Sequence, residues 1–202
     1  APQLVVNDKQ KSQFLERLPY TLTGAQQRVL QEISTDLAQA IPMQRLIQGD
    51  VGSGKTAVAA GAINHALVAG QQAAMMAPTS LLAEQHRLTL AEIFPDKGIA
   101  FLSGRLKTTE RREQLAKIAG DADIIIGTHA LFQDEVVYRD LALVIIDEQH
   151  RFGVHQRLSL KDKGADNDVL PHTLIMTATP IPRTLAQVAY ANLDISVIDE
   201  LP

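Results

Sequence analysis

The chain has 202 residues, of which 46% are hydrophobic and 21% are charged, and it contains no cysteine. A chain of this length and composition forms an ordinary globular domain with a substantial core, and the lack of cysteine excludes disulfides, thiolate metal sites and cysteine nucleophiles. The formal net charge of −4 argues against a domain that grips nucleic acid mainly through a basic face, although backbone N–H groups can still bind phosphates.

Helices and strands are predicted to alternate along most of the chain. Residues 1–20 are polar and lack a clear period, but Ser12–Leu18 favours a helix end that Pro19 stops. Thr23 is typical of an N-cap, and an apolar stripe of helical period covers Gly24–Ala40. Apolar runs of strand length occur at residues 45–48, 72–77, 99–102, 123–127, 141–146 and 173–176, and helical stretches at residues 57–69, 81–93, 109–119, 154–161 and 182–190.

The predicted strands are continuous apolar runs set between helices. This pattern indicates a mainly parallel sheet that is covered on both faces. We therefore predict an α/β domain of three layers, with ligands bound at the carboxyl ends of the strands. No apolar run approaches the length of a membrane span, and the first residues lack an apolar signal core, so we expect a cytoplasmic protein without a membrane partner.

A glycine-rich segment follows the strand predicted at residues 45–48. It matches the phosphate-loop pattern, in which glycines let backbone N–H groups close around phosphate oxygens. In that pattern Lys55 reaches the β- and γ-phosphates, and the Thr56 hydroxyl ligates Mg²⁺. A plain glycine-rich turn with a solvated Lys55 is the alternative, but a strand before the loop and a helix after it favour nucleotide binding. The predicted nucleotide-binding residues of the loop are Gly49, Gly52, Ser53, Gly54, Lys55 and Thr56.

Two adjacent carboxylates, Asp147 and Glu148, follow the strand predicted at residues 141–146. In a phosphate-loop nucleotide hydrolase, the first holds Mg²⁺ and the second orients and deprotonates the attacking water. Neighbouring side chains of a strand point to opposite faces, which separates these two roles. An acidic turn that merely closes a strand is the alternative, and the presence of Lys55 and Thr56 weakens it.

Thr177 and Thr179 follow the strand predicted at residues 173–176. Their hydroxyls would either hydrogen-bond His150 and register the presence of phosphate, or cap a turn before the next helix. The residues alone leave both interpretations open.

Taken together, these segments resemble the motifs of superfamily 2 helicases. Residues 49–56 resemble motif I, 77–85 motif Ia, 103–104 motif Ib, 127–130 motif Ic, 147–156 motif II and 177–184 motif III. The sequence Asp-Glu-Gln-His followed by Arg-Phe-Gly-Val-His-Gln-Arg resembles the RecG family of bacterial branched-DNA helicases. The sequence Thr-Ala-Thr-Pro-Ile-Pro-Arg is similar in the transcription-repair coupling factors. The resemblance covers residues 18–202.

The resemblance implies a RecA-like phosphate-loop fold that binds ATP and Mg²⁺ and uses ATP hydrolysis to move along duplex DNA at stalled forks and recombination junctions. It assigns catalysis to Lys55, Asp147 and Glu148, and coupling to His150, Thr177 and Thr179. It also implies DNA-backbone contacts, for which capped turns are the alternative. The implied DNA contacts are Thr79, Ser103, Gly104, Thr128 and His129.

The segment Leu18–Tyr20 with Thr23 and Gln26 resembles the Q-motif region of these helicases. The resemblance implies that Gln26 reads the edge of the adenine. An exposed helix glutamine is the alternative.

The resemblance also implies more domains than one. We expect residues 21–198 to be a first RecA-like lobe, residues 1–20 a linker or helix end from an upstream wedge domain, and residues 199–202 the start of a linker to a second lobe. The second lobe would supply arginines to the transferring phosphoryl group, so an isolated first lobe is expected to bind nucleotide weakly and hydrolyse it slowly.

Two other function classes fit parts of the sequence. A small-molecule kinase would need an arginine-rich lid, and the segment before Asp147 shows no such cluster beyond Arg105, Arg111 and Arg112. A nucleotide-dependent scaffold without turnover would keep its function in a Glu148→Gln variant.

Overall fold

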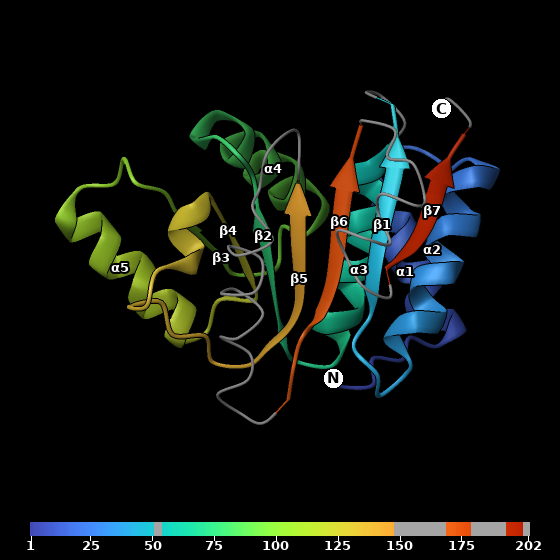
Figure 1. Cartoon of the computed structure of the whole chain (residues 1–202), viewed down its shortest axis with the longest axis horizontal. Helices are drawn as coiled ribbons and strands as arrows, with labels where there is room; N and C mark the ends of the chain where they lie inside the picture. Colours follow the sequence, from blue (N-terminus) through green and yellow to red (C-terminus); the bar gives the residue numbers. More distant parts are fainter. Residues whose placement is uncertain (51–53, 148–168, 179–192, 200–202) are drawn as a thin grey trace.

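The computed structural model describes residues 1–50, 54–147, 169–178 and 193–199. These residues form a seven-stranded sheet with the order β3-β4-β2-β5-β6-β1-β7 (Figure 1). All pairs of neighbouring strands are parallel, which confirms the predicted α/β fold with a mainly parallel sheet. The strands are β1 (Gln44–Gly49), β2 (Gln72–Met76), β3 (Ile99–Leu102), β4 (Ile124–Gly127), β5 (Leu141–Asp147), β6 (His172–Thr177) and β7 (Asp194–Ile198).

The described helices agree with the sequence pattern to within a turn, except at the N-terminus. The helices are α1 (Asp8–Arg17), α2 (Gly24–Leu37), α3 (Lys55–Val68), α4 (Ser80–Ile93) and α5 (Thr108–Ala119), with a 3₁₀ turn, η1, at His129–Phe132. The helices predicted at residues 154–161 and 182–190 lie outside the described residues. In the part of the chain that the structure describes, no helix has the length and apolar character needed to cross a membrane.

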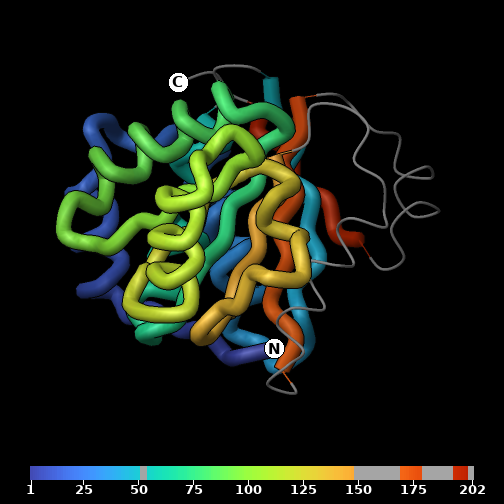
Figure 2. The backbone as a smooth tube through the Cα atoms, turned by 90° about the vertical axis from the view of Figure 1, so that its left-hand side faces the viewer, coloured from blue at the N-terminus to red at the C-terminus, as the bar shows by residue number. Residues whose placement is uncertain are grey.

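The strands bury alternate residues on two faces of the sheet, as their pleat requires. Ile47 and Ile145 belong to a core shared with the first four helices, whereas Leu46 and Ile146 belong to a second core with α5 and η1. Figure 2 shows α1, α2 and α4 together on one side of the strands. The sheet is thus the middle of three layers, with a hydrophobic core on each face.

The first twenty residues pack on the domain. Leu4 is fully buried and its backbone N–H donates to the carbonyl of Leu37 at 2.7 Å. In α1, which begins four residues before the predicted Ser12, Phe14 stacks on Phe94 with ring centroids 6.2 Å apart. This packing was not predicted, because the burial of Leu4 and Phe14 depends on residues distant in the chain. A link from these residues to an upstream domain stays a prediction.

Candidate nucleotide-binding site

Three neighbouring strands bring the predicted site residues to one edge of the sheet. β6 lies between β1 and β5, with Thr177 paired to Gln48 on one side and Met176 paired to Asp147 on the other. Because the three strands are parallel, their carboxyl ends lie at the same edge. This edge is where α/β folds bind ligands, beside the point at which the strand order reverses.

The phosphate loop leads from β1 into α3. Gly54 has φ of 81°, a left-handed conformation that suits glycine, and α3 begins at Lys55 with no side-chain cap. An uncapped helix start presents backbone N–H groups and the positive end of the helix dipole, which is a good environment for phosphate. Thr56 is half-buried in the first turn of α3. Of the other predicted loop residues, Gly49 is buried at the end of β1, and Gly52 and Ser53 lie outside the described residues.

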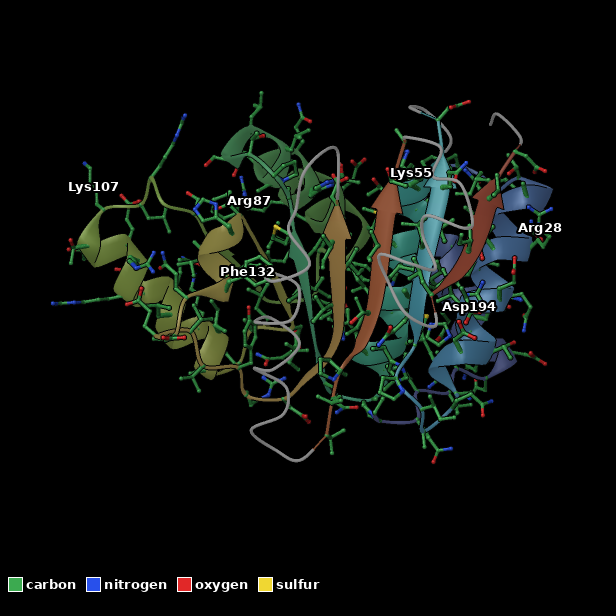
Figure 3. All side chains as sticks on the ribbon, in the orientation of Figure 1. Arg28, Lys55, Arg87, Lys107, Phe132 and Asp194 are labelled. Carbon is green, nitrogen blue, oxygen red and sulfur yellow. The ribbon has the colours of Figure 1, made fainter. Side chains whose placement is uncertain are left out.

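Lys55 and Asp147 both lie at this edge, after β1 and at the end of β5. The Lys55 ammonium donates hydrogen bonds to the carbonyls of Gly49 at 2.6 Å and Asp50 at 3.2 Å. Burial lowers the pKa of Lys55, while the negative charges of Asp147 and Asp50 act in the opposite direction. Figure 3 places Lys55 at the upper ends of β1 and β6.

The Asp147 carboxylate has a partner that the sequence analysis did not single out. Its Oδ2 atom lies 2.6 Å from the Nε2 atom of His86, in the middle of α4. An ionised carboxylate only accepts hydrogen bonds, so the imidazole donates from Nε2. Glu148, His150 and Thr179 lie outside the described residues, so their predicted roles are not placed.

Gln26 is fully buried, which excludes the alternative of an exposed helix glutamine. Its side chain accepts the backbone N–H of Thr23 at 2.9 Å, while the Thr23 hydroxyl accepts the backbone N–H of Gln26 at 3.2 Å. This reciprocal pair is a capping box and confirms Thr23 as the N-cap of α2. The Gln26 carboxamide also lies against Gly54, which places the Q-motif-like region directly beside the phosphate loop.

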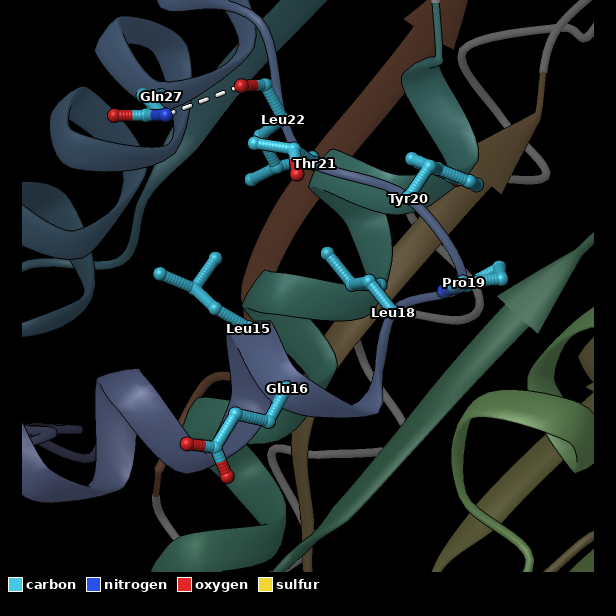
Figure 4. Close-up of a pocket in the computed structure, with 8 residues that line it drawn as sticks. All are labelled: Leu15, Glu16, Leu18, Pro19, Tyr20, Thr21, Leu22 and Gln27. Atoms are coloured by element: carbon cyan, nitrogen blue, oxygen red, sulfur yellow. Dashed lines mark hydrogen bonds between the residues drawn. The ribbon is translucent and has the colours of Figure 1, made fainter.

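A pocket of about 340 Å³ opens between the end of α1 and the start of α2 (Figure 4). Tyr20 and Pro19 line it, and across from them Gln27 donates from Nε2 to the Leu22 carbonyl at 3.1 Å. The lining residues come from the segment between Leu15 and Gln27, which leads from α1 into α2. It is thus a concave, partly apolar surface next to the start of α2.

Thr177 is buried at the carboxyl end of β6, between the strands that carry Asp147 and the phosphate loop. This position is next to the candidate nucleotide site. Because Thr179 and His150 lie outside the described residues, coupling through Thr177 stays a prediction.

The five predicted DNA contacts follow the carboxyl ends of β2, β3 and β4, at the same edge of the sheet. Thr79, Gly104 and His129 are exposed. Ser103 and Thr128 are buried, and their hydroxyls accept the backbone N–H groups of Arg105 at 3.3 Å and Ala130 at 3.4 Å. These two residues thus cap turns, and the Thr79 hydroxyl caps α4 by accepting the backbone N–H of Leu82 at 3.2 Å, which was the alternative interpretation. A DNA contact by any of the five stays a prediction.

A family model described as DEAD/DEAH box helicase matches residues 23–188. The chain belongs to the DEAD/DEAH box helicase family. Among curated members of this helicase family, the ATP-dependent DNA helicase RecG of Pasteurella multocida is 58% identical over 195 residues, covering 95% of this chain and 28% of that protein. RecG of Escherichia coli K12 is 57% identical and covers 100% of this chain and 30% of that protein. The resemblance to RecG is therefore confirmed, and the chain spans about 30% of the length of these relatives.

Solved helicase structures share the fold. The structure described as RecG bound to a three-way DNA junction has a TM-score of 0.82 at 43% identity, over 98% of this chain and 26% of that one. The helicase MrfA bound to DNA and AMPPNP has a TM-score of 0.72 at 18% identity, over 100% of this chain and 30% of that one. The first similarity confirms the predicted RecA-like lobe, and the second concerns the fold alone.

Proposed function

We propose that this chain is the ATP-binding motor lobe of an ATP-dependent DNA helicase that remodels branched DNA at stalled forks and recombination junctions. The observation that carries the proposal is that Asp147, at the end of β5, and Lys55, at the uncapped start of α3 after β1, lie at the same carboxyl edge of the sheet with only β6 between the two strands. Two RecG helicases that are 58% and 57% identical to this chain support DNA as the substrate.

The residues at this edge suit ATP and Mg²⁺. The N–H groups at the start of α3 and the Lys55 ammonium would hold the β- and γ-phosphates, and the Thr56 hydroxyl and Asp147 carboxylate are the hard oxygen ligands that Mg²⁺ prefers. Bound Mg²⁺ would neutralise charge on the phosphates. Gln26 would read the adenine edge from beside the pocket between α1 and α2, Glu148 would orient and deprotonate the water, and His150, Thr177 and Thr179 would couple hydrolysis to movement.

The exposed turns after β2, β3 and β4 supply the DNA side of the proposal. Thr79, Gly104 and His129 would contact the backbone of a forked duplex, with Ser103 and Thr128 shaping the turns behind them. Main-chain and hydroxyl donors can hold phosphates without a basic surface, which is compatible with the net charge of −4. Action on DNA would place the protein at the nucleoid.

The full-length helicase would also contain a second RecA-like lobe and a wedge domain on the same chain. Arginines of such a second lobe would raise the rate of phosphoryl transfer by about 10³ to 10⁵. Residues 1–202 alone are therefore expected to bind nucleotide weakly and to hydrolyse it slowly.

The test is ATPase activity with and without forked DNA, on wild type and Glu148→Gln, for residues 1–202 and for the full-length protein. We expect DNA-stimulated activity only in the full-length wild type. DNA-stimulated turnover of residues 1–202 that matches the full-length protein would contradict the lobe assignment. Function that survives Glu148→Gln would favour a scaffold without turnover.

A lobe like that of the transcription-repair coupling factors is the second candidate, because Thr-Ala-Thr-Pro-Ile-Pro-Arg is similar there. A comparison of ATPase stimulation by forked DNA and by linear duplex DNA separates the two candidates. A branched-DNA helicase is stimulated more by a fork than by linear duplex of equal length, whereas a duplex translocase responds equally to both.

A further inference from the structure

His86 and Asp147 form a hydrogen bond that joins two elements far apart in the chain. The Nε2 and Oδ2 atoms are 2.6 Å apart, and the two side chains are 13% and 12% exposed. A bond this short between largely buried groups is protected from competing water and holds both side chains in one geometry. We propose that His86 is a positioning residue that orients the Asp147 carboxylate for Mg²⁺. This inference rests on the proposed function, because it takes Asp147 as a metal-binding group.

α4 packs on the core on both sides of His86. Ala83 and Leu90, three residues before and four after it, are fully buried and belong to the core shared with the sheet. Residues at this spacing lie on one face of a helix, so His86 stands on the face of α4 that packs on the domain. The packing of α4 thus fixes the backbone position of His86, and the hydrogen bond to Asp147 orients its imidazole.

The bond leaves the carboxylate one oxygen for a cation. Oδ2 of Asp147 accepts the hydrogen bond from His86, and Oδ1, which has no hydrogen-bond partner among the described residues, can face a metal ion or its water shell. Hydrogen bonds from outside the ligand set commonly orient metal-binding side chains, and their loss costs about 10- to 100-fold in metal affinity or activity. Without His86, the carboxylate would rotate among several conformations and hold the cation less tightly.

Three variants of the full-length protein test the inference. His86→Leu removes the donor, and His86→Gln keeps an N–H donor at similar reach. Thr89→Val is the matched control: it is isosteric, lies on the same helix, and removes only a hydroxyl that bonds the Gln85 carbonyl within α4 at 3.0 Å. Thermal melting without nucleotide establishes that each variant is folded.

The readouts are the affinity for a fluorescent ADP, measured in EDTA and across a Mg²⁺ titration, and the Mg²⁺ concentration that gives half-maximal ATPase. In His86→Leu we expect about tenfold or more Mg²⁺ to be needed in both titrations, with unchanged ADP affinity in EDTA. His86→Gln should recover most of the loss, and Thr89→Val should match wild type.

An unchanged Mg²⁺ requirement in His86→Leu would overturn the inference. So would an equal loss of ADP affinity in EDTA, because that result is the signature of a damaged fold. If His86→Leu does not fold, His86→Asn, whose amide is too short to reach Asp147, replaces it with the same two outcomes. A wild-type protein without Mg²⁺-dependent ADP binding or ATPase would instead overturn the proposed function.

Discussion

The carboxamide of Gln26 fills the space that a side chain at Gly54 would need: its Nε2 atom stands where the Cβ atom of any other residue would lie. Gly54 also has φ of 81°, so glycine is required there by conformation as well as by contact. Two segments that the sequence separates, the start of α2 and the start of α3, are therefore fitted to each other at the candidate nucleotide site.

Gly54→Ala should lower the free energy of unfolding by about 2 to 5 kcal/mol. A left-handed conformation costs a non-glycine residue about 1 to 2 kcal/mol, and crowding into packed surroundings adds about 1 to 3. Urea unfolding followed by circular dichroism measures the change. Gly70→Ala is the control, because it shares a positive φ of 73° but has no atom near its added Cβ, and it should cost only the conformational part. Equal losses in the two variants would contradict the contact with Gln26.

A double-mutant cycle isolates that contact. Gln26→Ala alone should cost about 1 kcal/mol through loss of the capping box of α2. In the Gln26→Ala background, Gly54→Ala should cost at least about 1 kcal/mol less than in wild type, because the space it needs is then empty. Gln27→Ala, which removes the exposed neighbour, should leave the cost of Gly54→Ala unchanged. Strict additivity of Gln26→Ala and Gly54→Ala would show that the two side chains do not meet.

Lys55→Met should separate binding from stability. Burial already opposes the charge of Lys55, so its replacement by a neutral chain of similar length should change the free energy of unfolding by less than about 1 kcal/mol. Loss of a charged hydrogen bond to phosphate should weaken ATP binding by about tenfold to a hundredfold. Calorimetric titration and thermal melting measure the two effects.

Lys107→Met is the matched control for Lys55→Met. Lys107 is exposed and lies at the far end of the sheet from Lys55 (Figure 3). The ATP affinity of the Lys107→Met variant should equal that of wild type. An unchanged ATP affinity in Lys55→Met would contradict the placement of the phosphates at α3.

Most of the sheet was predictable because its strands are buried on both faces. Such strands are continuous apolar runs, and the six predicted ones agree with the structure to within two residues. Thr23 was predictable for a local reason, since its hydroxyl accepts the backbone N–H of Gln26, only three residues ahead. The start of α3 lies two residues before the predicted one, because Gly54 begins the helix from a left-handed conformation.

The parts that the sequence did not reveal depend on contacts between distant residues. β7 is an edge strand with Asp194 and Val197 exposed, so it lacks the apolar run that identifies the inner strands. His86 has an ordinary helical surrounding in the sequence, and only the folded chain places it against Asp147. Ser103 and Thr128 follow β3 and β4 as predicted, but the folded chain decides whether a hydroxyl bonds a ligand or its own backbone, and even the exposed Thr79 hydroxyl accepts the backbone N–H of Leu82 at 3.2 Å.

His65 should make the fold sensitive to mild acid. Burial lowers the pKa of its imidazole, which bonds the Ser34 hydroxyl at 2.6 Å and the Gly61 carbonyl at 2.7 Å. A lowered pKa in the folded state means that the unfolded chain binds the proton more readily, so stability is fully present above about pH 6.5 and is lost as the pH falls below it. His65→Gln should therefore show a smaller loss of unfolding free energy between pH 7 and pH 5.

His172 should contribute to the pH dependence of stability in the same way as His65. Its pKa is also lowered by burial, and its Nδ1 atom accepts the backbone N–H of Met43 at 2.8 Å. Wild type, His65→Gln, His172→Gln and the double variant should show progressively flatter stability between pH 7 and pH 5. Parallel curves for all four proteins would show that neither imidazole is kept neutral by the fold.

Gly127→Ala should be among the most damaging changes on the proposed DNA side. Gly127 pairs with both β2 and β3, and an added Cβ would meet the backbone carbonyl oxygen of Leu102, which cannot move aside without breaking the sheet. We expect a loss of about 3 kcal/mol in the free energy of unfolding. Gly104→Ala adds the same methyl group where no atom lies within 4 Å, and the free energy of unfolding should change by less than about 0.5 kcal/mol.

Because Thr128 and His129 follow Gly127 directly, Gly127→Ala should also weaken binding of forked DNA by the full-length protein at temperatures where the variant is still folded. Gel-shift titration measures that loss, and a folded Gly127→Ala protein with wild-type DNA affinity would remove the turn after β4 from the proposed DNA surface.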